Sequence, residues 1–259
     1  MEDRKQKERE FSEKFRENHA GAAMGNQKFY SVTRGSRDFF KEWLRQRCSG
    51  RKVLDYGCGD GMFTVWLAEQ GADATGVDIS GVSFPDAQKV ADEKGVGSKV
   101  HFFEMDCEHM SFPDESFDFV MEGGVLHHLD LAAALAELAR VVKRDGAVIC
   151  GEAVADNPLV HLYRKKTPQM RTAWEVDHIL HVRDLKVAKR YFEKVDVRFF
   201  HLFTILAVPF RNTFLFKPVL SLMEAIDSVF LKLPGIRTQA WQMIFILSKP
   251  KQTATEQAT

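Results

Sequence analysis

The fold is decided by one stretch of the 259-residue chain, Lys52-Val53-Leu54-Asp55-Tyr56-Gly57-Cys58-Gly59-Asp60-Gly61. Its apolar first half predicts a buried strand, and the three alternating glycines predict a sharp turn whose backbone a ligand can approach closely. The apolar residues Met62, Phe63, Trp66 and Leu67 then follow at helical spacing. A strand, a glycine turn and a helix in this order form the first half of a nucleotide-binding α/β unit.

Two features distinguish this turn from a dinucleotide-binding one. The glycine spacing is Gly-x-Gly-x-Gly, and Asp55 lies two residues before the first glycine, where it would repel a pyrophosphate. A carboxylate there suits a ligand with a positive group, such as an ammonium. The next predicted strand, in Asp73–Ile79, contains Asp78, which lies 23 residues after Asp55 and suits hydrogen bonds with ribose hydroxyls.

These two strands resemble the first motifs of the class I S-adenosylmethionine-dependent methyltransferases. Two further segments extend the resemblance: Phe117–Leu129, with its Phe-Asp-x-Val and Leu-His-His patterns, and Arg140–Gly146 before the fifth strand. Both are similar to the small-molecule branch that includes the ubiquinone/menaquinone biosynthesis methyltransferases. The resemblance covers about residues 50–153 and implies S-adenosylmethionine as the cofactor.

The resemblance also implies which residues bind that cofactor. Asp106, after the third strand, would accept a hydrogen bond from the adenine amino group, and the backbone amide of Cys107 would face a ring nitrogen. For Asp106, capping of the following turn is the alternative. The full set of implied cofactor-binding residues is Asp55, Gly57, Gly59, Asp78, Ile79, Asp106, Cys107, Glu122 and Gly123.

Composition excludes several other classes of protein. Thirty-six basic residues balance 36 acidic ones, so no net field attracts nucleic acid. The four cysteines have no metal-ligand spacing, and we expect reduced thiols and no metal. The charged N-terminus lacks an apolar signal core, and no apolar run reaches the length of a membrane span. We expect a cytoplasmic protein, with attachment to a membrane surface as an alternative.

Alternating strands and helices predict an α/β fold: a Rossmann-like, seven-stranded, mainly parallel sheet with helices on both faces and an acceptor cap. Later strands are expected near 73–77, 100–105, 117–121, 146–152, 195–202 and 241–248, the last antiparallel. We expect residues 1–48 to form N-terminal helices that act as a lid, and residues 49–250 to form a methyltransferase domain. Cap insertions are expected at 154–190 and 204–238, with a disordered tail at 251–259. A disordered arm is the alternative for residues 1–19.

His127 and His128 are the candidate catalytic residues. An imidazole titrates near neutrality and could take a proton from the acceptor as the methyl group arrives. Packing, or capping of the helix that begins near Asp130, is the alternative role for either of them. Methyl transfer depends chiefly on positioning, so a dedicated base is not required.

The methyl acceptor is expected to contact the first insertion, which follows the fifth strand and is rich in Arg, Lys and His. Such residues suit an acceptor with an anionic group and an apolar body. The second insertion is apolar and predicts a cover for the acceptor or a face that rests on a membrane surface; an amphipathic helix that covers the sheet, or a dimer contact, is the alternative. The candidate acceptor-binding residues are Tyr30, Tyr163, Arg164, Arg171 and His178; for Tyr30, packing is the alternative.

The expected function is therefore methyl transfer from S-adenosylmethionine to an oxygen of a small, partly apolar acceptor, lipidic or anionic in character. One alternative is a quinone-type C-methyltransferase. Another is a protein that binds S-adenosylmethionine without methylating, such as a cyclase or a regulatory module. Oxygen, carbon and nitrogen acceptors remain open at this point.

Overall fold

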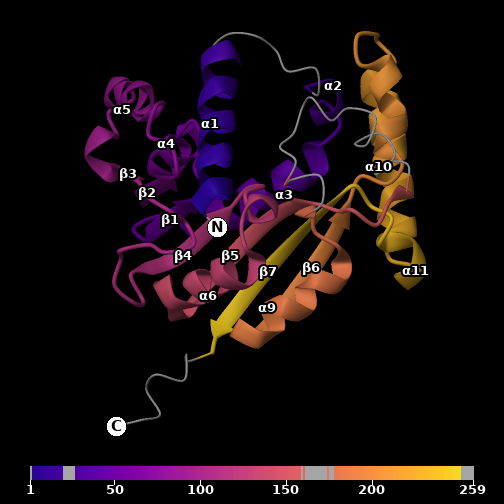
Figure 1. Ribbon diagram of the computed structural model, residues 1–259. Coiled ribbons are helices and arrows are strands. Elements are labelled where there is room, and N and C mark those ends of the chain that lie inside the picture. Colours follow the sequence, from indigo (N-terminus) through magenta and orange to yellow (C-terminus); the bar gives the residue numbers. More distant parts are fainter. Residues whose placement is uncertain (1, 20–26, 159, 161–173, 175–177, 252–259) are drawn as a thin grey trace.

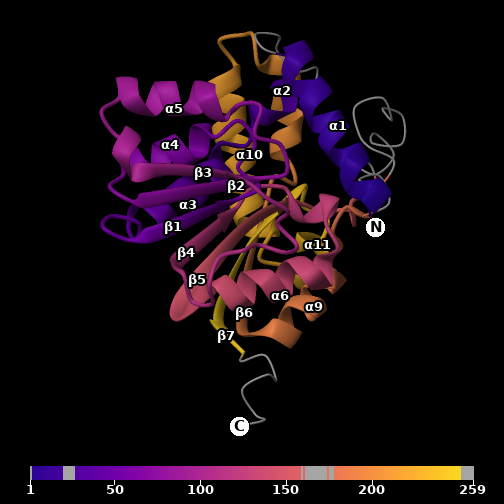
Figure 2. The same ribbon diagram turned by 60° about the vertical axis from the view of Figure 1, so that its left-hand side comes forward.

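The structure is a computed structural model that describes residues 2–19, 27–158, 160, 174 and 178–251. Its centre is a seven-stranded sheet in the order β3-β2-β1-β4-β5-β7-β6 (Figures 1 and 2). The strands are β1 (Lys52–Tyr56), β2 (Asp73–Asp78), β3 (Val100–Glu104), β4 (Phe117–Glu122), β5 (Val142–Ala153), β6 (Phe192–Phe200) and β7 (Gln242–Pro250). The predicted Rossmann-like fold is thus confirmed.

Strand direction brings the ends of most strands to one edge of the sheet. Strands β1 to β5 pair in parallel, so their carboxyl ends share that edge. Strand β7 is antiparallel to both of its neighbours, β5 and β6, as expected for the last strand. Strand β6 therefore runs in the same direction as β5, and the chain leaves β6 at the edge where the other parallel strands end.

Helices cover both faces of the sheet and bury two clusters of apolar side chains. On one face lie α6 (Leu131–Val141) and α9 (Leu185–Tyr191), which pack Leu135, Leu138 and Leu185 against the strands. On the other face lie α3 (Arg34–Arg45), α4 (Met62–Glu69) and α5 (Phe84–Glu93), with Phe40 and Leu44 of α3 buried. Central strands such as β1 and β2 are therefore buried on both sides, whereas the edge strands β3 and β6 are partly exposed.

Helix α6 begins where its sequence indicates. The side chain of Asp130 accepts hydrogen bonds from the backbone N–H groups of Ala132 and Ala133, at 3.0 and 2.9 Å. These bonds satisfy donors that a helix N-terminus leaves unpaired. The predicted cap at Asp130 is confirmed, and neither histidine before it supplies this cap.

Most of the remaining elements lie at or beyond the carboxyl edge, and η1 lies before β3 at the opposite edge. Helix α1 (Glu2–His19) crosses it, in agreement with the predicted N-terminal helix, and α2 (Gln27–Tyr30) follows (Figure 1). After β6 come η5 (Thr204–Phe210), α10 (Phe216–Phe230) and α11 (Pro234–Arg237). The short helices η1 (Gly97–Lys99), η2 (Leu126–His128) and η4 (Val182–Asp184) complete the described elements. The expected tail beyond residue 251 lies outside the described residues.

Candidate functional site

The glycine turn after β1 joins the ends of three strands. Gly57 has a φ of 75°, and its N–H donates to the carbonyl of Val77 at the end of β2. A Cβ on Gly57 would lie 2.7 Å from the side chain of Val125, which follows β4. Gly59 also has a positive φ, of 58°. Both positions therefore favour glycine for the turn, and Gly57 also requires it because the loop after β4 approaches so closely.

Asp78 holds this turn in place. Its carboxylate accepts hydrogen bonds from the N–H groups of Gly59, at 2.9 Å, and Ser80, at 3.0 Å. The residue is 8 % exposed, and Ile79 beside it is half-buried. A carboxylate has about four acceptor positions. Asp78 can therefore hold its own loop and also accept hydrogen bonds from ligand hydroxyls.

Asp55 lies deeper than Asp78. It is 1 % exposed and accepts a hydrogen bond of 2.6 Å from the hydroxyl of Thr64 on α4. Burial, together with the nearby carboxylates of Asp78, Asp60 and Glu122, raises the pKa of Asp55 to about 7 in spite of the Thr64 hydrogen bond. Asp55 therefore attaches α4 to β1, and its contact with a ligand stays a prediction.

Asp106 and Cys107 follow β3 at the same edge. The carboxylate of Asp106 accepts from the N–H of Glu108 at 2.9 Å, and Cys107 is buried, with its carbonyl accepting from the hydroxyl of Tyr56. The other oxygen of Asp106 lies 2.5 Å from the ammonium of Lys5 on α1. Helix α1 thus lies directly over the carboxylate that was predicted to receive the adenine amino group.

Further ion pairs attach α1 across this edge. Arg4 pairs with the buried carboxylate of Glu108, and Arg9 pairs with Glu104 at the end of β3. Lys5 is also 3.0 Å from Glu108. Burial lowers the pKa of Lys5, but hydrogen bonds and charges from Asp106 and Glu108 outweigh this and raise it overall. Helix α1 therefore lies as a charged strap across the ends of β3 and β4.

A chain of titratable groups lies at the ends of β4 and β5. His127 Nδ1 is 2.7 Å from a carboxylate oxygen of Glu152, and Glu152 is 2 % exposed. His128 Nδ1 is 2.9 Å from Glu8 of α1. One oxygen of Glu122 accepts from the N–H groups of Gly124 and Val125, both at 2.5 Å. The two histidine rings are 4.3 Å apart, so all these groups form one polar cluster.

The two buried glutamate side chains, Glu122 and Glu152, both have raised pKa values. Burial and the carboxylate of Glu152 raise the pKa of Glu122 well above its usual value. Burial also raises the pKa of Glu152, to about 7. Near neutrality Glu152 is therefore ionised in part, and it is the carboxylate beside His127. Such a carboxylate favours the His127 tautomer with hydrogen on Nδ1, in which Nε2 is the basic nitrogen.

Of the predicted acceptor-binding residues, the structure describes Tyr30 and His178. Tyr30 is 52 % exposed and its ring is 6.0 Å from that of Trp241, whose carbonyl accepts from Val154 at the end of β5. His178 is exposed and stacks on Trp174, with ring centroids 3.5 Å apart. Trp174 in turn lies 4.8 Å from the guanidinium of Arg4. Tyr163, Arg164 and Arg171 lie outside the described residues.

Sequence reasoning missed Glu152, Thr64 and the polar partners on α1. Glu152 could have been found, because it is an acid that follows the apolar run Ala147–Cys150 near the end of β5. Asp78 and Glu122 have the corresponding positions at the ends of β2 and β4. The partners on α1 are about 100 residues distant in sequence from Asp106 and Glu108, and no local pattern marks them.

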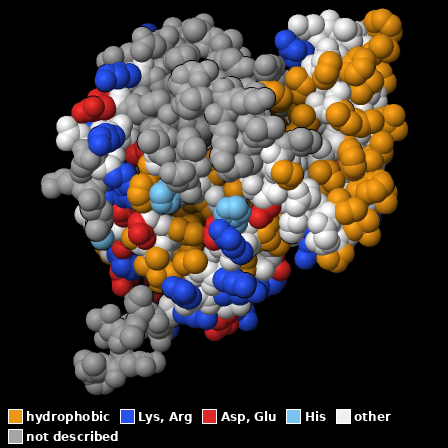
Figure 3. Space-filling model, turned by 45° about the vertical axis from the view of Figure 1, so that its right-hand side comes forward, with side chains coloured by type: hydrophobic (Ala, Val, Ile, Leu, Met, Phe, Trp, Pro, Cys, Tyr) orange, Lys and Arg blue, Asp and Glu red, His pale blue; other side chains and the backbone are white. Residues whose placement is uncertain are grey.

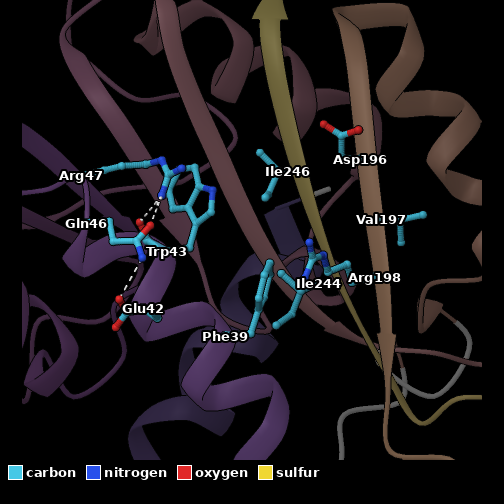
Figure 4. Close-up of a pocket in the computed structure, with 10 residues that line it drawn as sticks. All are labelled: Phe39, Glu42, Trp43, Gln46, Arg47, Asp196, Val197, Arg198, Ile244 and Ile246. Atoms are coloured by element: carbon cyan, nitrogen blue, oxygen red, sulfur yellow. Dashed lines mark hydrogen bonds between the residues drawn. The ribbon is translucent and has the colours of Figure 1, made fainter. Parts of the chain in front are cut away.

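A groove of ≈ 500 Å³ lies elsewhere, on the face of the sheet between α3 and strands β6 and β7 (Figure 4). Phe39 and Trp43 point into it from α3, and Ile244 and Arg198 from the strands. It contains none of the predicted site residues. In the part of the chain that the structure describes, no group of three His, Cys, Asp or Glu residues could hold a metal ion.

Comparison with known proteins finds similarity to methyltransferases. Residues 54–150 match a family model described as a methyltransferase domain. The chain is 37 % identical over 102 residues to a ubiquinone biosynthesis O-methyltransferase from Alkalilimnicola ehrlichii, covering 39 % of this chain and 40 % of that protein. It is 36 % identical over 105 residues to the ubiquinone/menaquinone biosynthesis C-methyltransferase UbiE of Bartonella henselae, with the same coverage. The chain thus spans less than half the length of these curated relatives.

Among solved structures, the fold is similar to phosphoethanolamine N-methyltransferase 2 from Haemonchus contortus in complex with S-adenosylmethionine. The TM-score is 0.61 at 17 % identity, covering 94 % of this chain and 60 % of that one. The sheet order and the family match define a class I methyltransferase fold. Residues 54–150 of this chain are similar to a methyltransferase domain, and the sheet that contains them has the fold of the class I S-adenosylmethionine-dependent methyltransferases.

The residues at the carboxyl edge fit S-adenosylmethionine. Asp78 and Asp106 provide carboxylate acceptors near the ends of neighbouring strands, at positions suited to ribose hydroxyls and to an amino group. A Cβ added to Gly123 or Gly124 would make only ordinary van der Waals contacts, at 3.5 and 4.0 Å, and Gly123 is exposed, so the backbone after β4 is accessible. A ligand can therefore lie against it.

Proposed function

We propose that the chain transfers the methyl group of S-adenosylmethionine to an oxygen of a small, partly apolar acceptor. The observation that carries this proposal is the contact of 2.7 Å between His127 Nδ1 and the buried Glu152. A base held in this way suits the deprotonation of a hydroxyl. The set Asp55, Gly57, Gly59, Asp78, Ile79, Asp106, Cys107, Glu122 and Gly123 is proposed to bind the cofactor.

The roles of the protein's own groups follow from their contacts. Bound S-adenosylmethionine supplies a methyl group on a positively charged sulfur. The Nε2 atom of His127 is proposed to take the hydroxyl proton of the acceptor, while Glu152 holds the ring and stabilises the imidazolium that results. Glu122, whose pKa is raised, fixes the loop after β4 through its backbone hydrogen bonds. The rest of catalysis is positioning.

Quinone-type C-methylation is the second candidate, because a C-methyltransferase matches this chain about as closely as an O-methyltransferase does. Methyl-labelled S-adenosylmethionine incubated with the protein and a cell extract separates the candidates. We expect S-adenosylhomocysteine and a product labelled on oxygen, both identified by mass spectrometry. Label on carbon would favour the second candidate, and cofactor binding without S-adenosylhomocysteine would contradict methyl transfer.

Replacement of the base tests its role. We expect His127→Ala to lower turnover by roughly 10²- to 10⁴-fold, as for loss of a general base, and to leave cofactor affinity unchanged. His101→Ala is the matched control, because His101 is exposed and pairs with Asp73 at the start of β2, at the opposite edge of the sheet. Equal turnover of the two variants would remove His127 from the mechanism.

A further inference from the structure

One face of the molecule exposes an unusual concentration of apolar side chains. Eleven large hydrophobic side chains are exposed among the described residues, and seven of them fall between residues 206 and 233. Phe214 is 90 % exposed at the turn before α10, and Leu222 and Val229, 57 % and 60 % exposed, lie seven residues apart on that helix. We call this set, completed by Leu206, Leu215, Phe230 and Leu233, the apolar face.

Figure 3 shows hydrophobic side chains gathered on the side of the molecule where α10 and α11 lie. The opposite side of α10 is already packed: Leu220 is 3 % exposed and belongs to a small core with Val32, Ala207 and Val208. The helix is therefore fixed to the body through its other side. Contiguous exposed apolar surface of this kind marks an interaction site.

The charges around the apolar face have one sign. Arg211, Lys217, Lys232 and Arg237 are exposed between residues 203 and 240. The two acids in that segment are engaged: Glu224 pairs with Arg34, and Asp227 is 6 % exposed and accepts from the N–H groups of Leu202 and Phe203. The partner surface must therefore be apolar at its centre and anionic at its rim.

We propose that the apolar face docks on the surface of a lipid bilayer with anionic headgroups. Apolar side chains flanked by Lys and Arg are the pattern of helices that lie in the membrane interface. In the described residues no helix is long and apolar enough to cross a bilayer, so contact at the surface is what this face provides. The projecting Phe214 enters the interface first, and the surrounding cations contact the headgroups.

The apolar face lies near the edge of the sheet that holds the candidate site, and docking through it goes beyond the proposed methyl transfer. Because β6 runs parallel to β5, η5 and α10 leave the sheet at the edge that holds His127, Asp78 and Asp106. A bilayer under the apolar face therefore lies on the side where the acceptor enters. Docking itself needs no cofactor or acceptor, so its test is independent of the proposed reaction.

The test is sedimentation of the full chain with vesicles of phosphatidylcholine, with and without phosphatidylglycerol. We expect binding to the anionic vesicles. Lys217→Ala combined with Lys232→Ala should weaken it roughly thirtyfold, because each cation near such a surface is worth about fivefold. Lys99→Ala, an exposed lysine on η1, is the control and should bind as the wild type does.

A second pair of variants tests the apolar contribution. Phe214→Ser should weaken vesicle binding tenfold or more, whereas Val82→Ser, at an exposed valine outside the apolar face, should not change it. Circular dichroism confirms that each variant is folded. Absence of wild-type vesicle binding would overturn the proposal. A stable dimer in light scattering that Phe214→Ser dissociates, again without vesicle binding, would assign the face to a second copy of the chain instead.

Discussion

Asp78 combines a structural and a ligand-binding task in one carboxylate. It already accepts two backbone hydrogen bonds, from Gly59 and Ser80, and the cofactor's ribose hydroxyls are expected to donate to the same oxygens. We expect Asp78→Asn to weaken binding of S-adenosylmethionine roughly ten- to a hundredfold, because an amide provides one acceptor atom and no charge. Isothermal titration calorimetry measures the dissociation constant.

Asp73→Asn is the control for that experiment, because Asp73 begins the same strand at the opposite edge of the sheet. Its affinity should equal that of the wild type. Unchanged affinity in a folded Asp78→Asn variant would remove Asp78 from the cofactor site.

Asp55 makes the stability of the fold depend on pH. Its pKa is about 7 in the folded protein and near 3.8 for an aspartate side chain in the unfolded chain, so between these values the folded state keeps a proton that the unfolded state has lost. Stability from this group is therefore complete below pH 4 and is lost as the pH rises to 7. We expect Asp55→Asn to remove a slope of up to about 1.4 kcal/mol per pH unit from the free energy of unfolding.

Urea unfolding between pH 4.5 and 8 measures this slope. The Thr64 hydroxyl can donate to Asn as it does to Asp, so the variant keeps the link between α4 and β1. The same pH dependence in both proteins would show that Asp55 is ionised throughout that range.

At the scale of elements, the strap α1 is expected to compete with the cofactor. Lys5 neutralises Asp106, which weakens that carboxylate as an acceptor for an adenine amino group. We expect Lys5→Ala to speed cofactor association and to make it less sensitive to salt, since salt screens the strap's ion pairs. Stopped-flow fluorescence measures the association rate.

Lys14→Ala, on the same helix nine residues further on, is the matched control and should associate at the wild-type rate. Equal rates for the two variants, with equal salt dependence, would mean that α1 does not gate the site.

The elements also show what local sequence can and cannot predict. Strands such as β2 and β4 were predicted within one residue at each end, because apolar runs and flanking turn residues determine them locally. Strand β5 is longer than predicted, since Val142 pairs with Phe117 of β4 and the strand therefore includes the polar Lys143–Asp145. The position of α1 depends on ion pairs with residues 100 positions away, which no local pattern encodes.

The candidate site could also be predicted only in part from local sequence. Glycines and acids at strand ends could be predicted, because strand direction alone brings them to one edge. The pairing of His127 with Glu152 could not, because it depends on how the chain turns after β4.

At the scale of the whole molecule, the sheet couples two cores. Leu138 lies fully buried in the cluster under α6 and α9, while Trp43 and Trp66 pack with the cluster on the other face. We expect Leu138→Ala to lower the free energy of unfolding by about 2–5 kcal/mol through the cavity it leaves. Urea unfolding followed by tryptophan fluorescence and by circular dichroism should give coincident transitions, because both cores share the same strands.

Leu222→Ala removes a similar side chain from the exposed side of α10 and should change stability by no more than about 0.5 kcal/mol. Separate transitions for the two probes would show that the layers unfold independently.

The direction of β6 places the apolar face and the candidate site at one edge of the sheet. This arrangement determines which concentration of acceptor would set the rate of the reaction. A protein resting on lipid by α10 samples the molecules in its own patch of membrane, and diffusion there is two-dimensional. The relevant concentration of a lipidic acceptor becomes its mole fraction in the surface. Adding inert lipid then slows the reaction even when the amount of acceptor per volume is constant.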